Sequence, residues 1–334
     1  MDKTHHQNLR LSQNDKYISP IEIPTLLVFF SGMFIWVGSF FLRLLYSVPS
    51  FITIPISILG VYLLFHVAHD STHGSISKYG FINDYIGSIC FIPFYFAPFH
   101  TFKYLHLQHH YNLNIPHLDP DYNTSGYFFG NKPLLGIIFH IFYYYLYFFS
   151  QIITSIIERL CQYKLFNREP KIKSSEANNS YRINTKNSKK IFNDKKLKKN
   201  LKIFIWTIVI IVIHFSITII AYYKGFLNDV MVLWIIPAYL SIIILSYLFD
   251  YLPHRDHKFT IQTNKYKATN MTEGIFNNNP NTQLLSILTL NQLTYHNIHH
   301  LYTNVPFYKY QEVWDQKKEE LIESNTSKMS QDKI

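Results

Sequence analysis

The amino-acid sequence predicts an all-α, polytopic membrane protein with four transmembrane helices, additional interfacial helices and a histidine-rich cap. Three observations predict this class. Hydrophobic residues make up 48% of the 334 residues, and charged residues only 16%. Four uncharged stretches of about 20 residues are long enough to cross the hydrocarbon core as helices. Histidines gather in short clusters, two of which directly follow such stretches.

The predicted spans are Ile23–Leu42, Val48–Val67, Ile203–Tyr223 and Val230–Phe249. Two further apolar stretches are predicted to be interfacial or re-entrant. Phe81–Phe99 is interrupted by polar residues and prolines, and Pro133–Ile157 is rich in aromatic residues, which favour the headgroup boundary. If all histidine clusters meet on one membrane face, an even number of crossings separates them, so Pro133–Ile157 cannot cross alone.

Charge and composition divide the chain further. Residues 1–22 are predicted to be a polar N-terminal tail, residues 23–312 the membrane domain, and residues 313–334 a charged C-terminal tail. Residues 160–202 form a basic insert that is predicted to be disordered. The segment 159–202 carries 14 Lys or Arg residues against three acids, and the positive-inside rule places it, with the histidine clusters, on the cytoplasmic side. Because basic juxtamembrane loops are common, we expect no nucleic-acid partner.

Histidine spacing points to metal binding. Box one, HVAHDSTHG, contains His66, His69, Asp70 and His73; box two contains His106, His109 and His110; box three contains His296, His299 and His300; a further pair is His254 and His257. Positions i, i+3 and i+4 share one face of a helix. Boxes two and three are therefore each predicted to aim three imidazoles at one point. His69 and His73 aim two more, whereas His66 is expected to point into the helix bundle.

The number and type of ligands indicate two iron ions. Eight or more histidines exceed what one ion accepts, since a structural zinc takes four ligands and a catalytic zinc about three. The His-Glu-x-x-His signature of zinc proteases and the Glu-x-x-His pairs of soluble di-iron bundles are absent from the sequence. What remains is a pair of ferrous ions bound only by nitrogen ligands, which is suited to activating O2 against a C–H bond. Asp70, Asp119 and Asp121 are candidates to accept N–H bonds from ligand imidazoles, Asp70 foremost.

At this point the sequence resembles the membrane fatty-acid desaturase and hydroxylase superfamily with its three histidine boxes. Several segments are most similar to the β-carotene hydroxylase branch: AHDSTHGSISKYGFINDYIG, HLQHHYNLNIPHLDPDY, YLPHRDH and HNIHHLYTNVPFYKY. The resemblance covers roughly residues 55–125 and 245–312. Asp256 departs from the proline that is common in the His-Arg-Pro-His-like stretch, which leaves the iron site intact but bears on substrate identity.

The resemblance implies a ligand set and a reaction. The implied ligands are His69, His73, His106, His109, His110, His254, His257, His296, His299 and His300. The implied activity is O2-dependent oxidation of a C–H bond in a lipid or carotenoid that enters from the bilayer. No Gly-x-Gly-x-x-Gly dinucleotide motif occurs, so we expect an external electron donor, ferredoxin or cytochrome b5.

Three functions compete at the level of sequence. Hydroxylation of a carotenoid ring, with β-carotene as substrate, is favoured by the branch-like segments. A fatty-acyl or sphingolipid desaturase or hydroxylase would use the same ions on a straight chain. A metal transporter is disfavoured because ionisable residues mark transport pathways. Apart from His66 of box one, His214 is the only histidine or charged residue within the predicted spans. We expect His214 to be structural.

Overall fold

A computed structural model of the chain describes residues 19–95, 97–122, 135–136, 138–139, 150, 185–254, 259–269, 284 and 286–326. Within these ranges the secondary structure is helical and contains no strand, which confirms the predicted all-α class. Four helices are long and apolar enough to cross a membrane: Ile23–Tyr46, Ser50–His73, Leu201–Lys224 and Leu227–His254. Each of the four predicted spans coincides with one of them.

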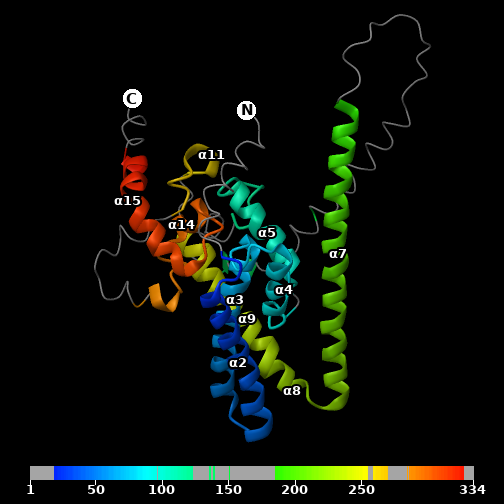
Figure 1. Cartoon of the computed structure of the whole chain (residues 1–334). Coiled ribbons are helices and arrows are strands. Elements are labelled where there is room, and N and C mark those ends of the chain that lie inside the picture. Colours follow the sequence, from blue (N-terminus) through cyan, green and yellow to red (C-terminus); the bar gives the residue numbers. More distant parts are fainter. Residues whose placement is uncertain are drawn as a thin grey trace, which may run out of the picture.

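The first two spans form an antiparallel pair, α2 (Ile23–Tyr46) and α3 (Ser50–His73) (Figure 1). Ser47 ends α2 in the left-handed conformation at φ 53°, and the chain reverses within three residues. α3 continues beyond the predicted end of its span to His73, so that its last turns carry box one. The apolar run and the first histidine box are therefore parts of one continuous helix.

A glycine allows α2 and α3 to approach closely. A Cβ atom on Gly60 would lie 2.7 Å from the backbone nitrogen of Trp36 and 2.8 Å from its Cα. Gly60→Ala therefore forces the two backbones apart, and overpacking of this kind costs about 1–3 kcal/mol. We expect a lower midpoint of thermal unfolding for this variant in detergent. Gly38→Ala is the control, because its Cβ would meet nothing within 4 Å; equal midpoints for both variants would contradict the close approach.

The second pair of spans joins α7 (Thr185–Lys224) to a helical run that ends at His254. Gly225, at φ 79°, makes the reversal. The returning run consists of α8 (Leu227–Val230), π-helix η2 (Met231–Ile235), α9 (Ile236–Leu245), π-helix η3 (Ser246–Tyr251) and α10 (Leu252–His254). π-Helical turns inside α-helices frequently occur at functional sites, and η3 here lies directly before α10, which ends at His254.

Between the two pairs, α4 (Gly80–Cys90) and α5 (Phe99–Asn112) form a bent hairpin. α4 has 11 residues and is about 17 Å long, too short to cross the membrane. Phe81–Phe99 is therefore not a span, as predicted. Most of Pro133–Ile157 lies outside the described residues, so its interfacial placement stays a prediction.

The turn between α4 and α5 is tied to the second pair of spans. The Tyr95 hydroxyl donates to the carbonyl oxygen of His214 on α7 at 2.7 Å, and Trp234 Nε1 donates to the carbonyl oxygen of Ile92 at 3.1 Å. The His214 ring lies 4.6 Å from the ring of Tyr95, between centroids. These contacts agree with the structural role expected for His214.

Helices run across two of the predicted boundaries. Residues 185–202 of the predicted disordered insert belong to α7, because lysine is a good helix former and the helix of the span extends into them; residues 160–184 lie outside the described part. The predicted C-terminal tail begins inside α15 (Tyr310–Thr326), whose Val313, Trp314 and Leu321 are buried. The domain thus continues past residue 312, because apolar residues recur among the charges of α15 and give it a buried face.

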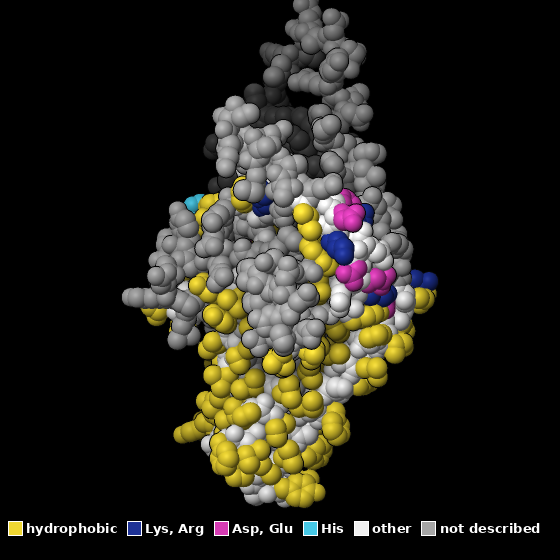
Figure 2. Space-filling view, turned by 90° about the vertical axis from the view of Figure 1, so that its left-hand side faces the viewer, with side chains coloured by type: hydrophobic (Ala, Val, Ile, Leu, Met, Phe, Trp, Pro, Cys, Tyr) yellow, Lys and Arg dark blue, Asp and Glu magenta, His cyan; other side chains and the backbone are white. Residues whose placement is uncertain are grey.

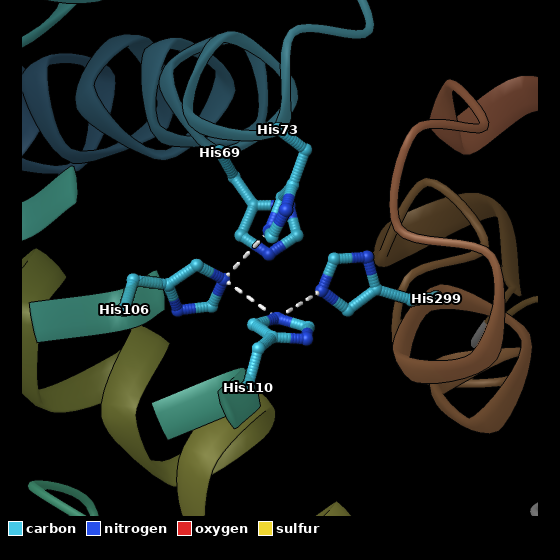
Figure 3. A group of neighbouring side chains, drawn as sticks. All are labelled: His69, His73, His106, His110 and His299. Atoms are coloured by element: carbon cyan, nitrogen blue, oxygen red, sulfur yellow. Dashed lines mark hydrogen bonds between the residues drawn. The ribbon is translucent and has the colours of Figure 1, made fainter. Parts of the chain in front are cut away.

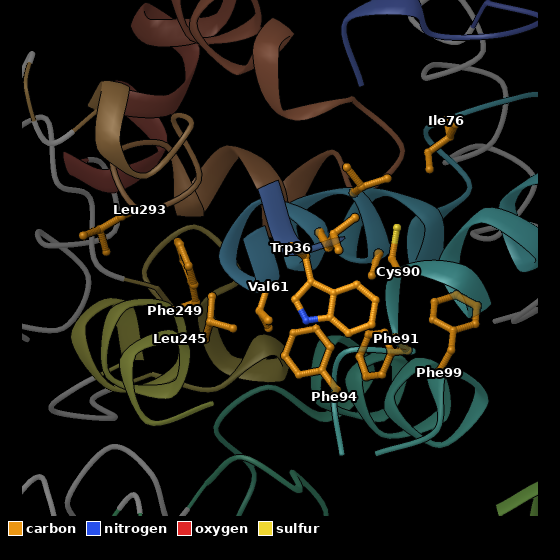
Figure 4. Close-up of a cluster of buried hydrophobic side chains, with 13 residues drawn as sticks. Trp36, Val61, Ile76, Cys90, Phe91, Phe94, Phe99, Leu245, Phe249 and Leu293 are labelled. Carbon is orange, nitrogen blue, oxygen red and sulfur yellow. The ribbon is translucent and has the colours of Figure 1, made fainter. Parts of the chain in front are cut away.

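The main hydrophobic core joins α2, α3, the α4–α5 turn and α9 (Figure 4). Aromatic rings dominate it, with Phe91 and Phe94 stacked at 4.8 Å and Phe65 and Phe249 stacked at 6.0 Å between centroids. A second core forms where α15 packs on α14 (His296–Leu301) and the chain between them. The first core fixes the ends of the spans, and the second fixes box three.

Hydrophobic side chains cover the lower half of the molecule, and charged side chains gather above it (Figure 2). α5, α14 and α11 (Ile261–Asn264) lie at the upper end of the helix bundle (Figure 1). α3 and α10 end there too, because Nε2 of His73 is 2.9 Å from that of His106 on α5 and Nε2 of His254 is 2.9 Å from that of His296 on α14. His73 and His254 are therefore at the same end of the helix bundle, as the even number of crossings between them requires.

Candidate metal centre

Four helices bring nine of the ten predicted ligands together. α3 supplies two histidines, α5 three, α10 one and α14 three: His69, His73, His106, His109, His110, His254, His296, His299 and His300. His257 lies outside the described residues. Eight of the nine side chains are buried, and His110 is partly buried. Such a concentration of buried imidazoles is costly unless something binds their nitrogen atoms.

The first group, site one, consists of His69, His73, His106, His110 and His299 (Figure 3). One nitrogen atom from each ring lies within 4.8 Å of those of all the others. Nε2 of His106 is 2.9 Å from Nε2 of His73 and 3.1 Å from that of His110. Nε2 of His110 is also 2.9 Å from Nε2 of His299. The five rings thus converge on a common centre.

These separations fit a bound transition-metal ion. Two imidazole nitrogens bound about 2.1 Å from one ion, at right angles, lie about 3.0 Å apart. The measured Nε2–Nε2 distances of 2.9–3.1 Å in site one match that spacing. Lone pairs that face each other at this distance repel unless a proton or a cation lies between them. The donor set therefore fits a metal ion.

The second group, site two, consists of His109, His254, His296 and His300. Ring nitrogens of His109, His254 and His300 lie within 4.8 Å of one another. Nε2 of His296 is 2.9 Å from Nε2 of His254 and 3.0 Å from Nε2 of His300. The two sites adjoin, since the rings of His110 and His300 stack with centroids 4.1 Å apart.

The prediction that boxes two and three each aim three imidazoles at one point is wrong. In box two, His106 and His110 belong to site one but His109 to site two; in box three, His296 and His300 belong to site two but His299 to site one. Successive residues of an α-helix are about 100° apart, so position i+4 is rotated about 40° from position i in one direction and i+3 about 60° in the other. Each box therefore contributes to both sites.

Carboxylates support site two. Nδ1 of His109 lies 2.8 Å from Oδ1 of Asp119 and 3.4 Å from Oδ2 of Asp121. Backbone amides of Asn114 and Asp121 donate to Asp119 at 2.8 and 2.9 Å, which holds this carboxylate in place. Burial lowers the pKa of His109, but Asp119 and Asp121 outweigh it and raise that pKa to about 9. The carboxylates thus favour positive charge at this imidazole.

The expectation that Asp70 foremost would hold a ligand is not met. Asp70 accepts from the Thr25 hydroxyl and from the backbone amide of Phe307, each at 3.4 Å. Its carboxylate ties α2 and the segment after box three to α3. His66 belongs to neither site; its Nδ1 lies 2.8 Å from the carbonyl oxygen of Tyr62 and its Nε2 3.3 Å from that of Thr289.

Most ligand histidines of α5 and α14 are kept in the form that binds metal. Burial, followed by repulsion between neighbouring imidazoles, lowers the pKa of His106, His110, His299 and His300 well below the usual value. The same causes lower the pKa of His296 to about 3. Metal ions bind the neutral imidazole, so these side chains are ready to bind at neutral pH.

Comparison with known proteins agrees with this geometry. The family model described as fatty acid desaturase matches residues 45–331. The chain belongs to the fatty acid desaturase family. An sn-1 oleoyl-lipid 12-desaturase of Arthrospira platensis is 40% identical over 55 residues, which are 16% of this chain and 15% of that protein. No solved structure matches the chain. Family membership and the four apolar helices point to an integral membrane protein.

A pocket in this desaturase-family chain connects the sites to the apolar core. Its walls include the rings of Phe65, Phe91, Phe94, Phe102 and Phe249. It is also lined by His69 and His106 of site one and by His109 and His296 of site two. A molecule in this pocket would therefore lie beside both groups of imidazoles.

Polar residues that were not predicted line the same pocket. Asp250 lies one residue beyond the predicted end of the fourth span, and Gln292 lies four residues before His296. The backbone carbonyl oxygen of Gln292 is 3.3 Å from Nδ1 of His296. The side-chain amide nitrogen of Gln292 is buried with no hydrogen-bond partner among the described residues. An acid adjoining an apolar run is a signal for Asp250; nothing in the sequence indicates Gln292.

Proposed function

We propose that this desaturase-family protein is a di-iron, O2-dependent oxidoreductase that hydroxylates a carotenoid ring, with β-carotene as substrate. The observation that carries the proposal is the pocket, which is lined both by phenylalanine rings and by imidazoles of the two sites. Flat aromatic faces stack well on a conjugated hydrocarbon. The four segments that resemble the β-carotene hydroxylase branch contain the histidine boxes and His254.

Iron is the metal that suits both the ligands and the reaction class. Imidazole binds zinc, copper, nickel and iron, but zinc has no redox chemistry, and the family is oxidative. When bound, two ferrous ions would let O2 attack a C–H bond, with one oxygen atom entering the alcohol, the other leaving as water, and two electrons and two protons consumed.

The residues of the chain position the substrate and exclude water. Phe102 stacks on His106 with centroids 5.2 Å apart, and Phe65 lies 6.0 Å from the ring of His69. These two phenylalanines also contact each other, with centroids 5.6 Å apart, so a ring bound against this pair would present a C–H bond to the imidazoles of site one. The apolar walls keep bulk water away from the oxidant, which suppresses side reactions.

The orientation and partners follow from charge and from the missing cofactor motif. The basic segment 159–202 adjoins the third span, and the positive-inside rule places it and the histidine boxes on the cytoplasmic side. Electrons would come from an external donor, ferredoxin or cytochrome b5. A basic cytoplasmic face would steer such an acidic protein to the iron sites.

Expression in a β-carotene-producing host tests the substrate. Chromatography of extracted pigments and membrane lipids should reveal new hydroxylated carotenoids and an unchanged acyl composition. The matched control is His109→Ala, which lacks a ligand of site two and should leave both profiles as in the empty host. Altered acyl chains with unchanged pigment would overturn the carotenoid proposal.

A second candidate is desaturation or hydroxylation of a fatty-acyl or sphingolipid chain. The similarity to an oleoyl-lipid desaturase favours it. The same two sites would act on a straight chain bound in the same pocket, so the lipid profile of the experiment above distinguishes the two candidates.

A further inference from the structure

One ligand of site one is in contact with a residue outside the histidine boxes. Nδ1 of His299 lies 3.0 Å from the hydroxyl oxygen of Tyr310, the first residue of α15. Tyr310 is 1% exposed. The contact is on the ring nitrogen opposite to Nε2, which faces His110 in site one.

The contact determines which nitrogen of His299 can bind metal. If Nε2 is to bind an ion, the ring proton must be on Nδ1, and Nδ1–H then donates to the hydroxyl oxygen of Tyr310. Partners of this kind fix the tautomer and the orientation of a ligand imidazole and raise its basicity. Without an acceptor at Nδ1, a buried N–H would be left without a partner, which is unfavourable.

Other imidazoles of site one lack such a partner. Nδ1 of His69 and Nδ1 of His110 are buried and have no hydrogen-bond partner among the described residues. In site two, Nδ1 of His300 likewise has no partner among the described residues, whereas Asp119 supports His109 and the carbonyl oxygen of Gln292 lies beside His296. Tyr310 thus supports a site-one ligand at Nδ1, where His69 and His110 have no such group.

The surroundings of Tyr310 hold its hydroxyl in place. It belongs to the second core, in which Val305, Phe307, Val313 and Trp314 are also buried. A phenol fixed by a packed helix loses little further conformational freedom when it accepts a hydrogen bond. α15, which the sequence presents as a charged tail, thus reaches the metal centre through one side chain.

We propose that Tyr310 is a positioning residue that sets the tautomer of His299 and thereby the metal affinity of site one. The inference rests on the metal binding assumed in the proposed function, but not on the substrate. It assigns a role in the metal centre to the C-terminal helix.

The test is a titration of purified, metal-free full-length protein with Fe2+ under anaerobic conditions. We expect the wild type to bind two ions and Tyr310→Phe to bind the ion of site one about 10–100-fold more weakly. Tyr308→Phe is the matched control, because the Tyr308 hydroxyl bonds to Glu22 and not to a ligand. This substitution removes a tyrosine hydroxyl two residues from Tyr310, and the Tyr308→Phe protein should bind both ions as the wild type does.

Combined variants locate the weakened ion. In the His254→Ala background, which retains site one, Tyr310→Phe should weaken the remaining ion. In the His110→Ala background, which retains site two, it should have no effect. Wild-type affinities in Tyr310→Phe, an effect confined to site two, or an equal loss in Tyr308→Phe would overturn the inference. A protein that binds both ions but oxidises no lipid would refute the proposed function alone.

Discussion

Replacing His254 with alanine should remove one of the two iron ions and abolish turnover. His254 supplies Nε2 to site two, 2.9 Å from Nε2 of His296, and comes from α10, far in sequence from all three boxes. Loss of a ligand leaves site two with fewer imidazoles to bind its ion, while site one keeps its five. We expect iron analysis of purified protein to give about half the wild-type content, with no product in the host assay.

The control for this prediction is a histidine outside both sites. His117 is exposed and has a φ of 64°, so asparagine, which tolerates the left-handed region, is the appropriate replacement. His117→Asn should retain full iron content. If His254→Ala also loaded two ions and turned over normally, His254 would not be a ligand.

Replacing Asp119 with alanine should weaken iron binding at site two by about 100-fold, the upper end of the range for such partners. The carboxylate contacts Nδ1 of His109 at 2.8 Å and accepts from the backbone amides of Asn114 and Asp121. The variant loses the partner of the imidazole and the two bonds that shape the loop after box two. Anaerobic Fe2+ titration measures the effect.

Asp84→Ala is the matched control for the loss of a carboxylate. Asp84 pairs with Lys103 at 2.7 Å, but its side chain is 49% exposed, and exposed pairs of this kind contribute about 0–1 kcal/mol. Iron binding should be unchanged in this variant. Similar affinities at site two in Asp84→Ala and Asp119→Ala would show that Asp119 does not support His109.

The membrane architecture could be predicted because its signals are local. A run of about 20 apolar residues forms a spanning helix whatever surrounds it, since lipid demands that the backbone bond to itself. The boundaries at 202 and 312 could not be predicted in the same way. Whether lysines continue a helix, or Trp314 and Leu321 find a core to pack in, depends on neighbouring elements.

The supporting groups of the ligands were predicted only in part. Asp119 and Asp121 were candidates and lie at His109, whereas Asp70 instead joins α3 to Thr25 and Phe307. Adjacency to a histidine in sequence favoured Asp70, but consecutive residues of a helix point about 100° apart. A neighbour in sequence is thus poorly placed to reach the same imidazole.

The sequence by itself predicted four helices of membrane-spanning length and the three histidine boxes, and the family resemblance added His254 to the implied ligands. Apolar length and histidine spacing are properties of single segments, so they can be read without the fold. Only the tertiary structure decided how the imidazoles divide between the two sites and that Tyr310 reaches His299. Each site combines side chains from separate helices, and their distances depend on how those helices pack.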